Sequence, residues 1–147
     1  MMNNERNRII DQLRRNAVAL ISLVIAVSSL SYNTWRNEKT EDNRNQRFAA
    51  FEILLKLGEL QQVVFHHHYD KDTSDKGNPR TGWTYVLTVR DLSRVLHPPL
   101  PDTADKLLAV WSENWGGLGE RTTNVDLIMQ SIDEMRGETL HLLESLE

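Results

Sequence analysis

The sequence predicts an all-α protein in which a single N-terminal transmembrane helix continues into a small antiparallel bundle of about four helices. Three observations predict this fold. Residues 16–35 carry no charge and are mostly apolar. From residue 48 onward, apolar residues recur three and four positions apart, which is the spacing of amphipathic helices. No two segments form a convincing strand pair, and a lone strand would leave its backbone groups without hydrogen bonds.

Composition divides the 147 residues into four parts. Residues 1–16 form a short basic tail, 17–35 the transmembrane helix, 36–47 a polar helical stalk, and 48–147 a soluble helical-bundle domain. The tail has a net charge of +2 and the chain beyond residue 35 a net charge of −6. An acidic domain repels a phosphate backbone, so we expect no nucleic-acid partner. The absence of cysteine excludes disulfides, thiolate metal sites and cysteine nucleophiles.

The uncharged segment from Asn16 to Trp35 has 20 residues, enough for a helix to cover the roughly 30 Å of bilayer hydrocarbon. Tyr32 and Trp35 lie at one end of it and Arg14 with Arg15 at the other, which is typical of residues at membrane interfaces. Two alternatives remain open: a cleaved secretory signal, for which 26–28 offers small residues, and the core helix of a soluble protein. We favour a single-pass span.

Basic residues flank both ends of this segment, but Arg14 and Arg15 directly adjoin the apolar run. The adjacency favours a cytoplasmic N-terminus and an extracytoplasmic soluble domain. One face of the segment has small or polar residues at steps of three and four, namely Ala19, Ser22, Ala26, Ser29 and Asn33. Small residues let membrane helices approach closely, so this face is a candidate helix–helix contact. The alternative is that alanine and serine are simply common in such helices.

Apolar periodicity returns after the polar stalk and predicts an amphipathic helix with a broad buried face. The helix should end near Tyr69, because residues 70–82 are rich in turn-forming residues. The predicted face contains Phe48, Phe51, Leu55, Gly58, Gln62, Phe65 and Tyr69, widened by Leu54, Leu57, Leu60, Val63 and Val64.

Residues 83–96 fit either a strand or a helix, and we predict a helix because a strand there would have no partner. The prolines of 97–101 end that element, and Asp102 offers an N-cap for the next helix, which Gly116 and Gly117 end. Thr123 and Asp126 have the spacing of a capping box at the start of the last helix. Its apolar positions are the most regular in the chain: Val125, Ile128, Ile132, Met135, Thr139, Leu142 and Leu146.

The densest group of metal-ligating residue types is His66, His67, His68, Tyr69, Asp70, Asp72 and Asp75. Of these, His66, His67 and Asp70 can share one helix face, but zinc needs three or four converging ligands. Histidines at a helix C-terminus also interact favourably with its dipole, which explains them without a metal. We therefore predict no metal site, no cofactor and no catalytic residue. Trp111 and Trp115 lie one turn apart and form either core or an aromatic patch for a partner.

These observations favour a non-enzymatic, membrane-anchored interaction or scaffold protein, an accessory subunit of a membrane complex. Its expected partners are the lipid bilayer and either another protein or a second copy of the chain. One alternative is a sensor-like helical domain that binds a ligand. Another is a metal-binding protein or enzyme that uses the cluster of His66, His67, His68 and Asp70.

Overall fold

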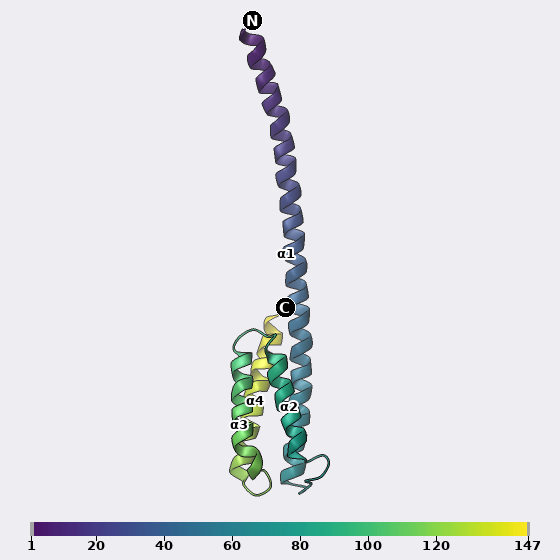
Figure 1. The fold of residues 1–147 in the computed structure, drawn as a ribbon, viewed down its shortest axis with the longest axis vertical. Helices are drawn as coiled ribbons and strands as arrows, with labels where there is room; N and C mark the ends of the chain where they lie inside the picture. The colour runs from purple at the N-terminus through teal and green to yellow at the C-terminus, as the bar shows by residue number, and fades with distance from the viewer. Residues whose placement is uncertain (1, 147) are drawn as a thin grey trace. The chain divides into compact units, whose positions relative to one another are not determined.

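The computed structural model describes residues 2–146, with side chains for 9–12 and 14–146; the side chains of Arg6 and Arg8 in the predicted basic tail lie outside that description. Within this range the chain is helical and contains no strand, so the all-α class is confirmed. Four α-helices and one short 3₁₀ helix follow one another (Figure 1): α1 Met2–His68, α2 Pro79–Ser93, α3 Leu100–Asn114, η1 Trp115–Gly117 and α4 Thr122–Ser145. The chain forms two compact units, Met1–Asp42 and Asn43–Glu147.

The first unit is the N-terminal part of α1. Among the described residues, one helix is long and apolar enough to cross a membrane, and none of its most apolar 18-residue window is buried within the chain. All residues from 14 to 42 are exposed. The rings of Tyr32 and Trp35 lie 6.0 Å apart, and the Lys39 ammonium lies 5.6 Å from the Trp35 ring centre. The aromatic and basic residues therefore gather where the apolar run ends.

The second unit has a hydrophobic core to which all four α-helices contribute. Figure 1 shows α2, α3 and α4 beside the teal part of α1, and α3 contacts both α2 and α4. Polar side chains link α1 to its neighbours: the Gln46 amide donates to the Val95 carbonyl at 2.8 Å, and Arg136 donates to Gln61 at 2.7 Å. The largest fully buried core side chains are Ile53, Leu57, Leu60, Leu100, Leu107, Trp111, Leu118, Ile128, Ile132 and Met135.

The helix predicted over residues 83–96 is confirmed as α2, although it begins earlier than expected. Asn78 is the N-cap and accepts a hydrogen bond from the Arg80 N–H at 3.0 Å, while Pro79 occupies the first helical position. Proline is favoured there because its missing N–H would have no partner in the helix anyway. Reading residues 78–82 as loop was therefore wrong, because Asn78 and Pro79 start a helix.

The predicted starts of the last two helices need correction. Asp102 was expected to be an N-cap, but α3 begins at Leu100 after the cis Pro98–Pro99 bond, and Asp102 lies in its first turn. The capping box of Thr123 and Asp126 does not form; α4 begins at Thr122, and its N-cap makes no side-chain hydrogen bond. The predicted α4 core positions are confirmed: all are buried except Leu142, which is partly buried against the core.

The predicted buried face of α1 is confirmed in part: Leu57, Leu60, Val63 and Val64, which widened it, are buried, but its central row is mostly exposed. The core uses Ile53, Leu57, Leu60 and Val64, which lie on one side of the helix and are fully buried. The central residues of the predicted face point away from that core, because both sides of this segment are apolar and the spacing alone does not distinguish them. The exposed positions are Phe48, Phe51, Leu55, Gln62, Phe65 and Tyr69.

Candidate interaction surfaces

An exposed apolar row runs along the part of α1 that belongs to the second unit. We call it the α1 stripe, and it consists of Phe48, Phe51, Leu55, Gly58, Gln62, Phe65 and Tyr69. Its large apolar members are 68%, 57%, 61%, 40% and 66% exposed in chain order. A Cβ added to Gly58 would meet no atom within 4 Å, so the middle of the stripe is open. Contiguous exposed apolar surface of this kind marks interaction sites in proteins.

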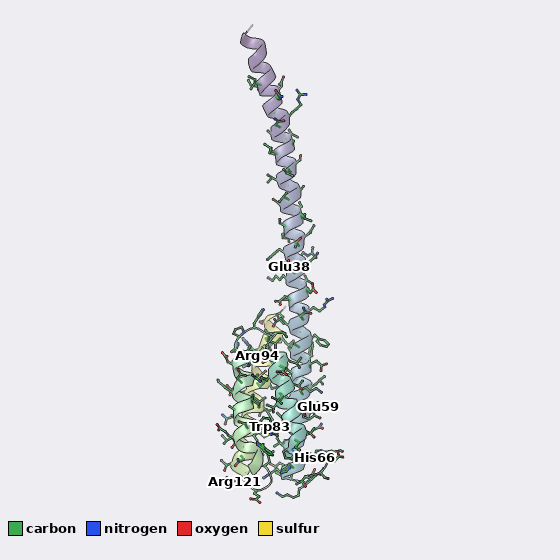
Figure 2. The ribbon with its side chains drawn as sticks, in the orientation of Figure 1. Glu38, Glu59, His66, Trp83, Arg94 and Arg121 are labelled. Carbon is green, nitrogen blue, oxygen red and sulfur yellow. The ribbon has the colours of Figure 1, made fainter. Side chains whose placement is uncertain are left out.

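Each of the three histidines at the end of α1 lies within hydrogen-bonding distance of a different partner. Figure 2 labels His66, the first of them. His66 Nδ1 lies 2.6 Å from an Asp70 carboxylate oxygen. His67 Nδ1 lies 2.7 Å from the Gly77 carbonyl, and His68 Nδ1 lies 2.8 Å from the Leu118 carbonyl. Within the described part of the chain, no group of three or more histidine or acidic side chains is placed to hold a metal ion. These rings tie the end of α1 to the loops around it.

The turn after α1 is organised by Asp72. Its carboxylate accepts hydrogen bonds from the backbone N–H groups of Ser74 at 2.9 Å and Asp75 at 3.2 Å. These bonds, led by the one from Ser74, favour the charged form and lower the pKa of Asp72 to about 2. The turn requires glycine at position 77, because a Cβ there would lie 2.6 Å from the His67 backbone nitrogen. The acidic residues near the histidines therefore include one that shapes the backbone.

The two tryptophans predicted as core or contact patch differ in exposure. Trp111 is fully buried, and a Cβ at Gly82 of α2 would lie 2.3 Å from its ring. Trp111 therefore offers no surface to a partner in this fold, and its side chain belongs to the core. Trp115 is 38% exposed and packs edge-on against Trp83 with ring centres 6.2 Å apart. A partner contact at Trp115 stays a prediction.

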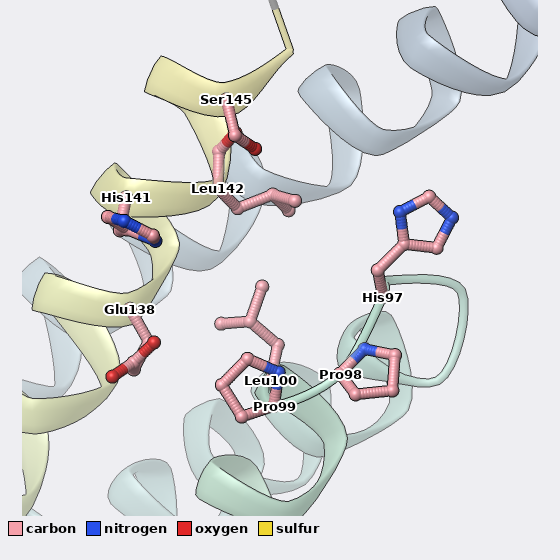
Figure 3. Close-up of a pocket in the computed structure, with 8 residues that line it drawn as sticks. All are labelled: His97, Pro98, Pro99, Leu100, Glu138, His141, Leu142 and Ser145. Atoms are coloured by element: carbon pink, nitrogen blue, oxygen red, sulfur yellow. The ribbon is translucent and has the colours of Figure 1, made fainter.

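A small cavity of about 240 Å³ lies between α4 and the loop that precedes α3 (Figure 3). Glu138 and His141 of α4 line one side, and His97 with Pro98 and Pro99 lines the other. No local sequence pattern indicates this cavity, because its two walls lie far apart in the chain. Its volume is below the roughly 300–1,000 Å³ of most ligand pockets.

The small-residue face predicted as a membrane helix contact lies in the first unit. Ala19, Ser22, Ala26 and Ser29 are all exposed on α1. Their helical placement puts them on one face, as the steps of three and four require. Their role as a helix–helix contact stays a prediction.

Comparison with known proteins adds no relative: no family model matches the chain, no curated protein matches it, and no solved structure matches its fold.

Proposed function

We propose that this chain is a single-pass membrane protein whose helical domain serves as a non-enzymatic interaction module, an accessory or scaffolding subunit of a membrane complex. The observation that carries the proposal is the apolar, uncharged stretch at residues 16–35, every residue of which is exposed within the chain. An exposed apolar surface of this length is unfavourable in water and favourable in a bilayer. Each central leucine, isoleucine or valine contributes roughly 0.3–0.6 kcal/mol to insertion.

The flanking residues support an orientation. Arg14 and Arg15 adjoin the apolar stretch on its N-terminal side, and cytoplasmic flanks carry the excess of arginine and lysine. We therefore place the N-terminus in the cytoplasm and the helical domain on the other side. Tyr32 and Trp35 then lie at the outer interface, where amphipathic rings are enriched.

For the domain we propose an antiparallel bundle. The connections between consecutive helices are short, covering residues 69–78, 94–99 and 118–121 with η1 before the last. Short connections favour antiparallel neighbours in helical bundles. The α1 stripe is the surface best suited to that role, because it is apolar and exposed.

The experiment that tests the anchor is carbonate extraction of membranes containing the full chain with a C-terminal tag. A transmembrane helix resists carbonate, so we expect the tag in the pellet and an intact mass that includes residues 1–35. A control variant, Leu23→Arg, places a charge near the middle of the stretch at a cost of about 2.5–3.5 kcal/mol and should weaken insertion. A tag released by carbonate would overturn the anchor, and a mass lacking the N-terminal segment would identify a cleaved signal.

Protease treatment of right-side-out and inverted vesicles tests the orientation. We expect the C-terminal tag to be digested in right-side-out vesicles and protected in inverted ones. The opposite pattern would place the helical domain in the cytoplasm. A double variant, Arg14→Ala with Arg15→Ala, removes the charge that favours this orientation and should increase the inverted fraction.

A further inference from the structure

We propose that the α1 stripe pairs with the same stripe of a second copy of this chain, parallel and in register, as a short two-stranded coiled coil. The inference deepens the proposed function and rests on it, because a membrane anchor gives all copies the same polarity and confines them to one plane. The stripe lies entirely within the second unit, so the pairing concerns Phe48 to Tyr69 alone.

The spacing of the stripe is the first support. From Phe48 to Tyr69 the steps are three and four in strict alternation, which is a seven-residue repeat carried over three heptads. Such a repeat suits two helices that wind around each other, because it keeps the same face toward the partner. The same alternation on α4 packs inside the bundle, so the repeat indicates packing between helices, and its place on the exposed side of α1 is what points to a second chain. The buried face of α1 is already satisfied by its own bundle, and the repeat falls on the exposed face.

The repeat assigns each residue a heptad position. The a positions are Phe48, Leu55, Gln62 and Tyr69, and the d positions are Phe51, Gly58 and Phe65. In a parallel pair, each of these residues meets its own counterpart. The f position opposite the contact falls on Gln46, Ile53 and Leu60, which are all buried in the bundle. The bundle therefore covers the side of α1 that a coiled coil leaves free.

Size varies along the stripe in a way that suits two close helices. Gly58 lies between the aromatic layers of Phe51 and Phe65, and nothing of the same chain occupies the space next to it. In a pair, that opening lets the helices approach and receives neighbouring side chains of the second copy.

Charge at the edges of the stripe favours the parallel arrangement. Arg47 occupies a g position and Glu52 the following e position, which face each other between the two copies of a parallel pair. The Arg47 guanidinium also donates to the Leu146 carbonyl of its own chain, which holds this charge at the edge of the stripe. The next such pairs are Leu54 with Glu59 and Gln61 with His66, so no two like-charged carboxylates or guanidinium groups oppose. An antiparallel pair centred on Gly58 would instead bring e positions together, and Glu59 would approach Glu59 of the second copy. Like charges placed opposite destabilise such contacts.

Gln62 supports a partner identical to this chain. A polar residue at one a position fixes register and favours a dimer, because its amide finds a hydrogen-bonding partner only opposite another polar group. In a parallel, in-register pair, Gln62 lies opposite Gln62, and each amide can both donate and accept. A lipid surface offers no such partner. The stripe is therefore complementary to itself in charge and in hydrogen bonding.

Disulfide cross-linking of the full chain tests the pairing directly, because the native sequence has no cysteine. We would place Phe48→Cys in phosphatidylcholine and phosphatidylglycerol vesicles and oxidise with copper phenanthroline. Position 48 lies at one end of the stripe, so two copies link there only when they are parallel and in register. The matched control is Val95→Cys, because Val95 is 60% exposed and Phe48 is 68% exposed. The Val95 backbone carbonyl accepts a hydrogen bond from Gln46, so Val95 lies on the side of α1 opposite the stripe.

We expect Phe48→Cys to give several-fold more covalent dimer than Val95→Cys, and a second change, Phe51→Glu, to abolish the excess. Both stripe residues are exposed, so the helical content measured by circular dichroism should not change. Equal yields from the two cysteines, or no dimer at Phe48, would overturn the pairing. A link at Leu55→Cys without one at Phe48→Cys would overturn the parallel register.

Carbonate extraction of the same vesicles separates this inference from the anchor. Carbonate-resistant protein without a Phe48 cross-link would overturn the pairing and leave the anchor standing. Cross-linked protein released by carbonate would support the pairing and overturn the anchor. A Phe48 cross-link in carbonate-resistant protein would support both.

Discussion

Residues 48–69, at the end of α1 and just beyond it, present two apolar faces that differ in burial. One face, with Ile53, Leu57, Leu60 and Val64, is fully buried in the bundle. The other, the α1 stripe, carries four aromatic residues and a leucine that are 40–68% exposed. Both faces contain residues that cores prefer, so residue type does not decide between them. A helix with two apolar faces therefore keeps one of them exposed after its own bundle has packed, and this exposed face is the one proposed above to contact a second copy.

Truncating one leucine on each face tests whether only the buried face stabilises the single chain. Leu57→Ala removes a fully buried side chain and should lower the free energy of unfolding by about 2–5 kcal/mol. Leu55→Ala removes a side chain that is 61% exposed and should change it by less than about 0.5 kcal/mol in the dissociated protein. Thermal unfolding of the full chain in dilute detergent micelles, followed by circular dichroism, measures both. Similar losses from the two variants would mean that the stripe is packed within one chain.

Adding a methyl group at two glycines, one beside the core and one on the stripe, tests the same difference between the two faces. Gly82→Ala places a Cβ 2.3 Å from the Trp111 ring and should destabilise the bundle by about 1–3 kcal/mol through overpacking. Gly58→Ala meets no atom within 4 Å and should stabilise the helix by about 0.5–1 kcal/mol, since alanine has the higher helix propensity. The same unfolding measurement compares them. A stabilising Gly82→Ala would contradict the close approach of α2 to Trp111.

A smaller effect is expected from Asp72, in the turn after α1, on the pH dependence of stability. The pKa of Asp72 is lowered from 3.8 to about 2, chiefly by the hydrogen bond from the Ser74 N–H. Because its pKa is lower in the folded chain than in the unfolded one, its stabilising contribution is complete above about pH 4 and is lost as the pH falls toward about 2. The Tm of Asp72→Asn should therefore fall less steeply than that of the native chain in this range. Identical slopes would show that Asp72 makes no net contribution.

The sequence predicted the fold class well because most segments have one apolar face. Val125, Ile128, Ile132 and Met135 follow one repeat on α4, and all are buried as expected. The helical reading of residues 83–96 also proved right, since no strand was at hand to pair with it. Where only one face is apolar, periodicity alone identifies the side that packs.

The sequence was less informative about helix starts and about surfaces. The start of α3 has Pro99 as its N-cap, without a side-chain hydrogen bond, which local capping rules do not foresee, so Asp102 was misplaced as a cap. The α1 stripe was mistaken for core because both sides of the segment are apolar. The cavity beside His97 and His141 depends on packing between distant segments and leaves no local pattern. Each of these features is set by tertiary contacts.

The contact between Gly82 and Trp111 constrains how this sequence can change over generations. While the indole is present, any side chain at position 82 strikes the ring. Among the described residues the Trp111 indole N–H has no hydrogen-bond partner, and a buried donor without a partner costs about 1–3 kcal/mol in general. A smaller residue at position 111 would open a space that alanine at position 82 could then fill. The two positions are therefore coupled, and Gly82→Ala should cost less stability in a chain whose residue 111 is smaller than tryptophan.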